Sequence, residues 1–178
     1  MTPDYYDMVF SESPVYSIDP EESIYYPLWL RVKEMLTDDR VFELGCGTGQ
    51  LAQMIENYIR GIDFSPVAIE MAKKRNPCKV FQLANLDNLK EKDFRGVDTV
   101  IMIEVLEHLK NDVGLIDVIP QGKRVILSVP NFMSESHVRI YTGLKDIEER
   151  YPDLIIKNFI AFQTNETNRI FLIDSYKI

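Results

Sequence analysis

The chain has 178 residues, 46% of them hydrophobic and 27% charged, which predicts one soluble domain with a buried core. No apolar run approaches the roughly 20 residues of a membrane-spanning helix, and the N-terminus lacks the basic start and apolar core of a signal peptide, so we expect a cytoplasmic protein without a membrane partner. The net charge of −8 opposes binding to nucleic acid, and two cysteines, Cys46 and Cys78, make neither a zinc motif nor a disulfide framework.

Two segments precede the regular part of the pattern. Residues 1–21 are rich in Tyr, Ser, Pro and Asp, which predicts an irregular segment, and we interpret it as a lid. Residues 22–37 are predicted to be an N-terminal helix, because Glu22–Leu36 places Leu28, Trp29 and Val32 on one side. The core of the single domain is expected over residues 41–178.

From residue 41 onwards, short β-type runs alternate with helical patterns, which is typical of an α/β domain with a mainly parallel sheet. The predicted strands are Val41–Leu44, Tyr58–Ile62, Lys79–Leu83, Val97–Ile101, Arg124–Val129, Ile155–Gln163 and Asn168–Tyr176. The predicted helices between them are Gly49–Glu56, Pro66–Arg75, Val105–Asp117 and Leu144–Tyr151. Only a short polar turn separates the last two strands, so they should form an antiparallel hairpin.

The most informative segments follow the first two strands. Residues 41–50 read VFELGCGTGQ, and residues 61–65 read GIDFS. Glycines after a strand let the backbone turn tightly beside a nucleotide-shaped cofactor. Asp63, at the end of the second strand, can accept hydrogen bonds from both ribose hydroxyls, and Phe64 offers a flat apolar face to a purine.

The spacing of the glycines discriminates between cofactors. A dinucleotide site needs G-x-G-x-x-G, but here Gln50 stands in place of the third glycine, and the Lys-Ser/Thr pair of a P-loop is missing. Glu43 would repel a pyrophosphate and attract an ammonium group. The pattern therefore favours a cationic cofactor without phosphate, which describes S-adenosylmethionine (SAM), over NAD.

The two segments closely resemble motifs I and II of the class I SAM-dependent methyltransferases. The resemblance implies a Rossmann-like seven-stranded mixed sheet of order 3-2-1-4-5-7-6, with strand 7 antiparallel and helices on both faces. It also implies that the glycine loop approaches the methionine part of SAM, Glu43 its ammonium and Asp63 its ribose, while Phe64 and Leu86 enclose the adenine. The expected cofactor-binding residues are Glu43, Gly45, Cys46, Gly47, Gly49, Asp63, Phe64, Asn85, Leu86 and Glu104.

Asn85 occupies the place where this family often has an Asp that accepts from the adenine amine. An Asn side-chain oxygen can accept the same hydrogen bond. It can equally form a turn with its own backbone, so both interpretations stay open.

After the fourth strand, Glu104, Glu107 and His108 form the pattern E-x-x-E-H. Residues three and four apart share a face of a helical turn, so the three side chains could converge. His137, the other of the two histidines, follows the fifth strand at the same carboxyl edge of the sheet. Two carboxylates and two imidazoles suit a divalent metal ion. The alternatives are a catalytic role for His108 and His137, with His108 the first choice as general base, and a purely structural role.

This second pattern resembles the ubiquinone-biosynthesis O-methyltransferases and the small-RNA 2′-O-methyltransferases, whose metal ligands come from an E-x-x-E-H and a later His. The same segment also occurs in class I enzymes that bind no metal. The leading hypothesis is therefore a SAM-dependent methyltransferase that acts on an oxygen of a small molecule. A metal-dependent RNA 2′-O- or protein methyltransferase, and a catalytically silent SAM-binding module, are the alternatives.

Overall fold

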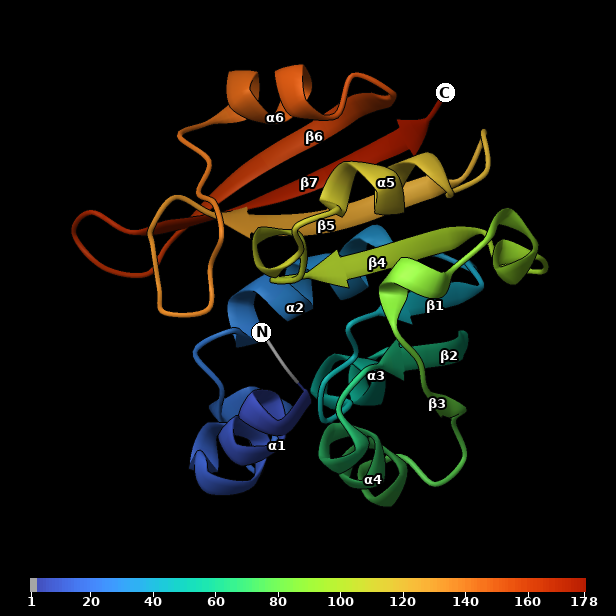
Figure 1. The fold of residues 1–178 in the computed structure, drawn as a ribbon, viewed down its shortest axis with the longest axis vertical. Coiled ribbons are helices and arrows are strands. Elements are labelled where there is room, and N and C mark those ends of the chain that lie inside the picture. The colour runs from blue at the N-terminus through green and yellow to red at the C-terminus, as the bar shows by residue number, and fades with distance from the viewer. Residues whose placement is uncertain (1–2) are drawn as a thin grey trace. The chain divides into compact units, whose positions relative to one another are not determined.

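The computed structural model describes residues 3–178, which fall into two compact units that divide between Asn88 and Leu89. The strands form a seven-stranded mixed sheet of order β3-β2-β1-β4-β5-β7-β6 with β7 antiparallel, which confirms the predicted topology. The first unit runs from blue to green in Figure 1 and the second from green to red.

Three parallel strands form the centre of the first unit: β1 (Val41–Leu44), β2 (Tyr58–Asp63) and β3 (Phe81–Leu83). Every residue of β1 is buried, as expected of a parallel strand covered on both faces. The register places Glu43 of β1 beside Gly61 of β2. The acidic residue and the glycine are therefore neighbours across the two strands.

The helices of this unit include α2 (Tyr26–Met35), α3 (Gln50–Met54) and α4 (Pro66–Arg75), and the unit ends with the 3-10 turn η3 (Leu86–Asn88). The start of α4 follows the predicted signals. Pro66 fixes the first-turn geometry, and the Ser65 hydroxyl accepts a hydrogen bond of 3.0 Å from the Ala68 N–H.

The prediction of an irregular segment over residues 1–21 is wrong for the described part. Helix α1 (Pro3–Glu12) is followed by the 3-10 turns η1 (Pro14–Tyr16) and η2 (Pro20–Glu22). The aromatic side chains explain the difference. Tyr6 contacts Phe64 and Phe10 contacts Tyr16, with ring centroids 5.2 and 4.8 Å apart, so tertiary packing stabilises a helix that the composition alone did not predict. The helix predicted to begin at Glu22 begins at Tyr26.

The second unit contains β4 (Thr99–Ile103), β5 (Arg124–Pro130), β6 (Leu154–Gln163) and β7 (Arg169–Lys177). β4 and β5 are parallel, and β7 pairs antiparallel with both β5 and β6, so the predicted terminal hairpin is confirmed. Helix α6 (Leu144–Arg150) connects β5 to this hairpin, and the 3-10 turn η4 (Glu91–Phe94) precedes β4.

One helix prediction in this unit is wrong. Instead of a helix over 105–117, the chain forms the 3-10 turn η5 (Leu106–His108) and the separate helix α5 (Asp112–Asp117). Leu109 is extended, with φ −93° and ψ 130°, which ends the turn. Within residues 3–178, no helix has the length and apolar character needed to cross a membrane.

Candidate functional site

The loop after β1 uses its backbone N–H groups internally. Gly45, Gly47 and Gly49 have φ of 72°, 50° and 75°, the left-handed region in which only glycine is relaxed. The N–H groups of Gly45 and Cys46 both donate to the Ile62 carbonyl, at 2.8 and 2.9 Å. Gly49 donates to the Cys46 carbonyl at 3.0 Å. A phosphate site would need such N–H groups to point at the ligand, so the loop suits a cofactor without phosphate.

Asp63 closes this loop onto the end of β2. Its Oδ2 accepts a hydrogen bond of 3.0 Å from the Gly47 N–H, and its Oδ1 accepts one of 2.9 Å from the Ser65 N–H. Burial raises the pKa of this carboxyl group, although the backbone hydrogen bonds oppose that shift. Each carboxylate oxygen has a further lone pair, so Asp63 can organise the loop and still accept from ribose hydroxyls.

Helix α1 contacts the same region. The Asp7 carboxylate accepts hydrogen bonds from the Ser65 hydroxyl and, at 3.3 Å, from the Val67 N–H at the start of α4. The Phe10 ring would lie 3.6 Å from a Cβ at Gly47. The first helix therefore packs against the glycine loop and against the residues that follow Asp63.

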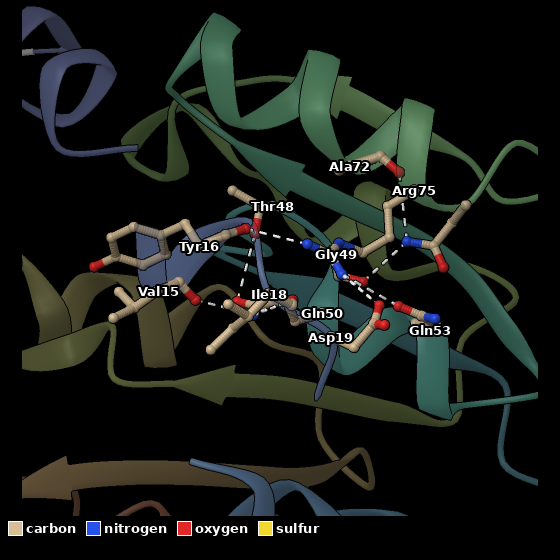
Figure 2. Close-up of polar contacts among 11 residues, drawn as sticks. Val15, Tyr16, Ile18, Asp19, Thr48, Gly49, Gln50, Gln53, Ala72 and Arg75 are labelled. Atoms are coloured by element: carbon tan, nitrogen blue, oxygen red, sulfur yellow. Dashed lines mark hydrogen bonds and ion pairs between the residues drawn. The ribbon is translucent and has the colours of Figure 1, made fainter. Parts of the chain in front are cut away.

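Figure 2 shows the hydrogen bonds that the segment after α1 forms with this loop and with Arg75 of α4. The Gln50 amide donates to the carbonyls of Val15 and Ile18, both at 3.1 Å. The Thr48 hydroxyl and the Arg75 guanidinium donate to the Tyr16 carbonyl, at 2.9 and 3.1 Å. Gln50 replaces the third glycine of a dinucleotide motif, and its side chain thus binds the protein's own backbone.

Glu43 is buried at the end of β1, and its Oε2 accepts a hydrogen bond of 2.6 Å from the Tyr58 hydroxyl. Burial raises the pKa of Glu43 to about 8, and the charge of Asp63 adds to the rise, whereas the bond from Tyr58 and the charge of Lys79 oppose it. A buried acid of this kind gains from a cationic partner, which fits the ammonium group of SAM.

The loop after β3 supports one of the two interpretations of Asn85. Its Oδ1 accepts a hydrogen bond of 2.9 Å from the Asp87 N–H, which forms a turn with its own backbone. Leu86 is buried, at 8% exposure, while the ring of Phe64 is half-buried. The contact of Asn85 with an adenine remains a prediction.

Glu104 differs from the other acidic residues of the second unit. It adopts a φ of 55°, unusual outside glycine, and its Oε1 accepts a hydrogen bond of 2.7 Å from the Ser128 hydroxyl. The Ser128 hydroxyl in turn accepts from the Glu104 N–H at 2.9 Å. Burial raises the pKa of Glu104 to about 7. Such strain in a non-glycine residue is concentrated at functional sites, but Glu104 does not join the cluster described next.

Three residues of the second unit do converge. Glu107, His108 and His137 each offer one ligand atom, and these atoms lie within 4.8 Å of one another. The imidazole rings of the two histidines have centroids 4.9 Å apart. The predicted convergence is therefore found for three of the four proposed metal ligands. Glu107 and His108 lie on a 3-10 turn rather than on an α-helix, and His137 lies in the loop after β5.

The backbone fixes the orientation of both imidazoles. Nδ1 of His108 donates to the Ser136 carbonyl at 3.1 Å, and Nδ1 of His137 donates to the Phe132 carbonyl at 3.0 Å. Because a carbonyl can only accept, each Nδ1 carries the proton and each Nε2 carries the lone pair. Metal-binding histidines commonly show this arrangement, in which a backbone carbonyl fixes the tautomer.

Glu107 completes the cluster with a carboxylate that is fully buried. Among the described residues neither of its oxygens accepts a hydrogen bond, and Oε1 lies 3.7 Å from Nε2 of His108. Burial raises the pKa of Glu107 well above its usual value, with a further rise from Glu104, whereas its own backbone N–H and the charge of Arg139 oppose the shift. A buried carboxylate without hydrogen-bond donors is costly, and a cation beside it would remove that cost. The donor set thus fits a divalent metal ion.

Sequence reasoning missed three residues that shape these sites: Asp7, Tyr58 and Arg139. Asp7 lies in the segment that was predicted to be irregular, and Tyr58 looks like an ordinary strand residue. Arg139 lies beside His137, and its contacts are formed with a turn that lies about 30 residues earlier in the chain. No local pattern reveals such contacts.

Comparisons with known proteins identify a methyltransferase domain. The family model of a methyltransferase domain matches residues 42–121, which include the glycine loop, Asp63 and the E-x-x-E-H segment. No curated protein matches the chain.

Several solved structures share the fold. The chain is similar to magnesium protoporphyrin IX methyltransferase from Synechocystis with bound S-adenosylhomocysteine (SAH), at 20% identity over 85% of this chain and 79% of that chain, with a TM-score of 0.61. A SAM-dependent methyltransferase from Anabaena variabilis is 13% identical over 99% of this chain and 95% of that chain (TM-score 0.72). An N-methyltransferase from Bradyrhizobium japonicum is 14% identical over 85% and 93% (TM-score 0.64).

Four observations lead to one assignment. They are the strand order, the glycine loop with its internally bonded N–H groups, the acidic residue that ends β2, and the matched family model. Residues 42–121 match a methyltransferase domain, and the chain has the seven-stranded Rossmann-like fold of the class I SAM-dependent methyltransferases.

Proposed function

We propose that this methyltransferase transfers the methyl group of SAM to a hydroxyl oxygen of a small molecule, and that Glu107, His108 and His137 bind a divalent metal ion that takes part. The observation that carries the proposal is the convergence of two oriented imidazoles and one buried carboxylate within 4.8 Å. A neutral hydroxyl oxygen is a weak nucleophile until its proton is removed, whereas a neutral amine nitrogen can attack the methyl group without prior deprotonation. A site that assists proton loss therefore favours oxygen as the acceptor atom.

The first unit supplies the proposed contacts to SAM. Asp63 accepts from the ribose hydroxyls, Glu43 attracts the ammonium group, and Phe64 and Leu86 contact the adenine. The loop from Gly45 to Gly49 lies along the methionine part. The support for these roles is the acceptor-rich character of the site, since it holds two buried acidic side chains, Glu43 and Asp63, beside loop N–H groups that are already bonded. Methyl transfer itself relies on the reactivity of the sulfonium, so the protein mainly orients the reactants.

The role of His108 as an unaided general base has less support than a role as metal ligand. Burial lowers the pKa of His108 to about 4, with a contribution from His137, and burial also lowers the pKa of His137. Neutral imidazoles with such low basicity are poor proton acceptors, because an efficient base has a pKa near the working pH. A neutral imidazole is the form that binds a metal. When bound, a divalent ion would lower the pKa of a coordinated hydroxyl group.

Charge favours a small acceptor over RNA. The chain carries 28 acidic and 20 basic residues, and this excess of negative charge opposes phosphate backbones. Magnesium protoporphyrin IX methyltransferase, which is similar in fold, is named for a small-molecule acceptor. An RNA or protein acceptor, or a catalytically silent module, would be recognised in the experiment that follows.

A transfer assay tests this function. The chelator-treated protein is incubated with methyl-labelled SAM and, in separate reactions, pooled small metabolites, structured RNA or unfolded protein, with and without Mn²⁺. We expect label in the small-metabolite fraction only, in an oxygen-linked product, with a rate that rises on addition of Mn²⁺. Label in RNA or protein alone would identify the alternative acceptors. No transfer to any pool, together with tight binding of SAH, would identify a silent module.

The contribution of the metal is tested separately. His108→Ala and His137→Ala should each abolish the Mn²⁺-dependent part of the rate while SAH binding, measured by calorimetry, stays unchanged. Asp63→Asn should instead weaken SAH binding and should have a smaller effect on the Mn²⁺-dependent part of the rate. If the rate is the same with chelator and with Mn²⁺, the metal proposal is wrong while the methyltransferase assignment stands.

A further inference from the structure

Arg139 lies between the two segments that carry the metal-ligand candidates. Its Nη1 donates to the Leu106 carbonyl at 2.6 Å and also to the Leu109 carbonyl, and its Nη2 lies 3.4 Å from the Lys110 carbonyl. Leu106 begins η5, the turn that carries Glu107 and His108, and Leu109 and Lys110 follow that turn. The Leu106 carbonyl also accepts from the Leu109 N–H at 3.3 Å, and an arginine can donate to several carbonyls at once.

The backbone on either side of His137 is hydrogen-bonded to the same turn. The Val138 N–H donates to the Glu107 carbonyl at 2.8 Å, and the Ser136 carbonyl accepts from His108. His137, placed between them, therefore has neighbours on both sides that are bonded to η5. The separation of its ring from that of His108 depends on how this segment is fixed.

A buried acid fixes the guanidinium in turn. Nη2 of Arg139 lies 3.1 Å from Oδ1 of Asp112, whose side chain is only 1% exposed. Asp112 also accepts from Nε and Nη2 of Arg150, at 2.6 and 2.7 Å, and from the Tyr151 hydroxyl at 2.6 Å. The acid thus has donors on all sides, and the guanidinium of Arg139 is held both by Asp112 and by the carbonyls of η5.

We propose that Arg139, held by Asp112, is a positioning residue that keeps His137 beside Glu107 and His108. The inference rests on the proposed acceptor site, but it concerns the geometry of the apo protein and can be measured without metal. Among the described residues no hydrogen bond or ion pair is found between Arg139 and the ligand atoms, although its charge acts on the Glu107 carboxyl group. It acts by holding the two backbone segments together.

Variants of Arg139 test this role, with a matched control in the same unit. Arg139→Gln removes the charge and most donors, and Arg139→Lys keeps the charge but cannot donate to several carbonyls in a fixed geometry. The control is Arg124→Gln, because Nε of Arg124 donates at 2.8 Å to the buried Asp174 in a comparable Arg–Asp pair between β5 and β7. The chain has only two histidines, so their ring signals are easily assigned by NMR.

In the wild-type apo protein we expect cross-relaxation between the ring protons of His108 and His137, because the centroids are 4.9 Å apart. This signal should disappear in Arg139→Gln, weaken in Arg139→Lys and persist in Arg124→Gln. Titration with Co²⁺ should show an affinity about 10- to 100-fold lower in Arg139→Gln, the usual effect of removing a group that orients metal ligands. SAH affinity should not change in any of the three variants.

The outcomes separate the two proposals. The positioning role would be overturned if folded Arg139→Gln or Arg139→Lys showed the same cross-relaxation and the same Co²⁺ affinity as the wild-type protein. If Arg139→Gln does not fold, the test relies on Arg139→Lys. Its cross-relaxation and Co²⁺ affinity are then compared with those of Arg124→Gln under conditions in which both variants have lost the same thermal stability. If the wild-type protein binds no Co²⁺ but the ring signal still depends on Arg139, the positioning role stands and the metal proposal fails.

Discussion

The Tyr58 hydroxyl reaches the buried Glu43 carboxylate by passing over Gly61, which is the strand partner of Glu43. A Cβ at Gly61 would lie 2.1 Å from the Tyr58 hydroxyl oxygen and 2.7 Å from the Cys46 Cβ. The glycine that opens the G-I-D-F-S segment thus has a packing reason. The absence of a side chain at Gly61 lets the Tyr58 hydroxyl donate a hydrogen bond to the acidic residue at the end of β1.

Replacement of Gly61 by Ala should therefore destabilise the protein by about 1–3 kcal/mol, the usual cost of overpacking a buried site. Chemical denaturation of wild type and variant measures this difference. Gly143→Ala is the control, since nothing lies within 4 Å of its Cβ position. In the double variant with Tyr58→Phe, the loss of stability should be smaller than the sum of the losses in the two single variants, because removing the hydroxyl relieves one of the two collisions. Additive losses would contradict this contact.

Glu43 should make stability depend on pH. Its pKa is raised from 4.5 to about 8 in the folded protein, chiefly by burial, so between these values the folded state holds a proton that the unfolded state has released. The free energy of unfolding should therefore fall as pH rises from about 4.5 to about 8, by at most about 1.4 kcal/mol per pH unit.

Comparison with Glu43→Gln isolates this effect, because the amide does not titrate. The stability of wild type relative to this variant should decline through that pH range and then level off. Glu70→Gln, at an exposed position of α4, should follow the wild-type curve. A constant difference between wild type and Glu43→Gln from pH 5 to 8 would show that Glu43 is ionised throughout.

Gln50→Glu should loosen the segment between α1 and η2. The change places a carboxylate against the carbonyls of Val15 and Ile18, which now accept from the amide at 3.1 Å, so two attractive contacts become repulsive. We expect faster hydrogen exchange over residues 13–19 and weaker SAH binding, if this segment acts as the lid. Gln53→Glu is the control, because Gln53 is exposed and its oxygen already accepts from Arg75 at 3.4 Å. Unchanged exchange in Gln50→Glu would contradict the role of this contact.

Asp63→Ala should weaken SAM binding by about 1–3 kcal/mol, the contribution of charge-assisted hydrogen bonds to the ribose. The structure adds a second effect, since the N–H groups of Gly47 and Ser65 lose their acceptor, and the thermal midpoint should fall as well. Calorimetry with SAH measures the affinity. Asp87→Ala, at an exposed position, should leave affinity and midpoint unchanged. Undiminished SAH binding in Asp63→Ala would show that the ribose is not bound there.

The sequence by itself determined the α/β class, all seven strands to within a few residues, and the cofactor motif at Glu43–Gly49 and Asp63. These features depend on local signals: buried apolar runs, glycines at positions of positive φ, and a capped helix start at Ser65. It also identified Glu107, His108 and His137 as residues that could meet.

Only the tertiary structure decided which groups bond to one another. It showed helix α1 where composition predicted none, because the helix is stabilised by aromatic contacts with residues such as Phe64, more than 50 positions away. It divided the helix predicted over 105–117 into η5 and α5, and Arg139 donates to the carbonyls of Leu106 and Leu109 in this part of the chain. It also showed that Glu104 accepts a hydrogen bond from Ser128, whereas Glu107 lies beside the two histidines. Such contacts join distant parts of the chain, so no periodicity or spacing in the sequence encodes them.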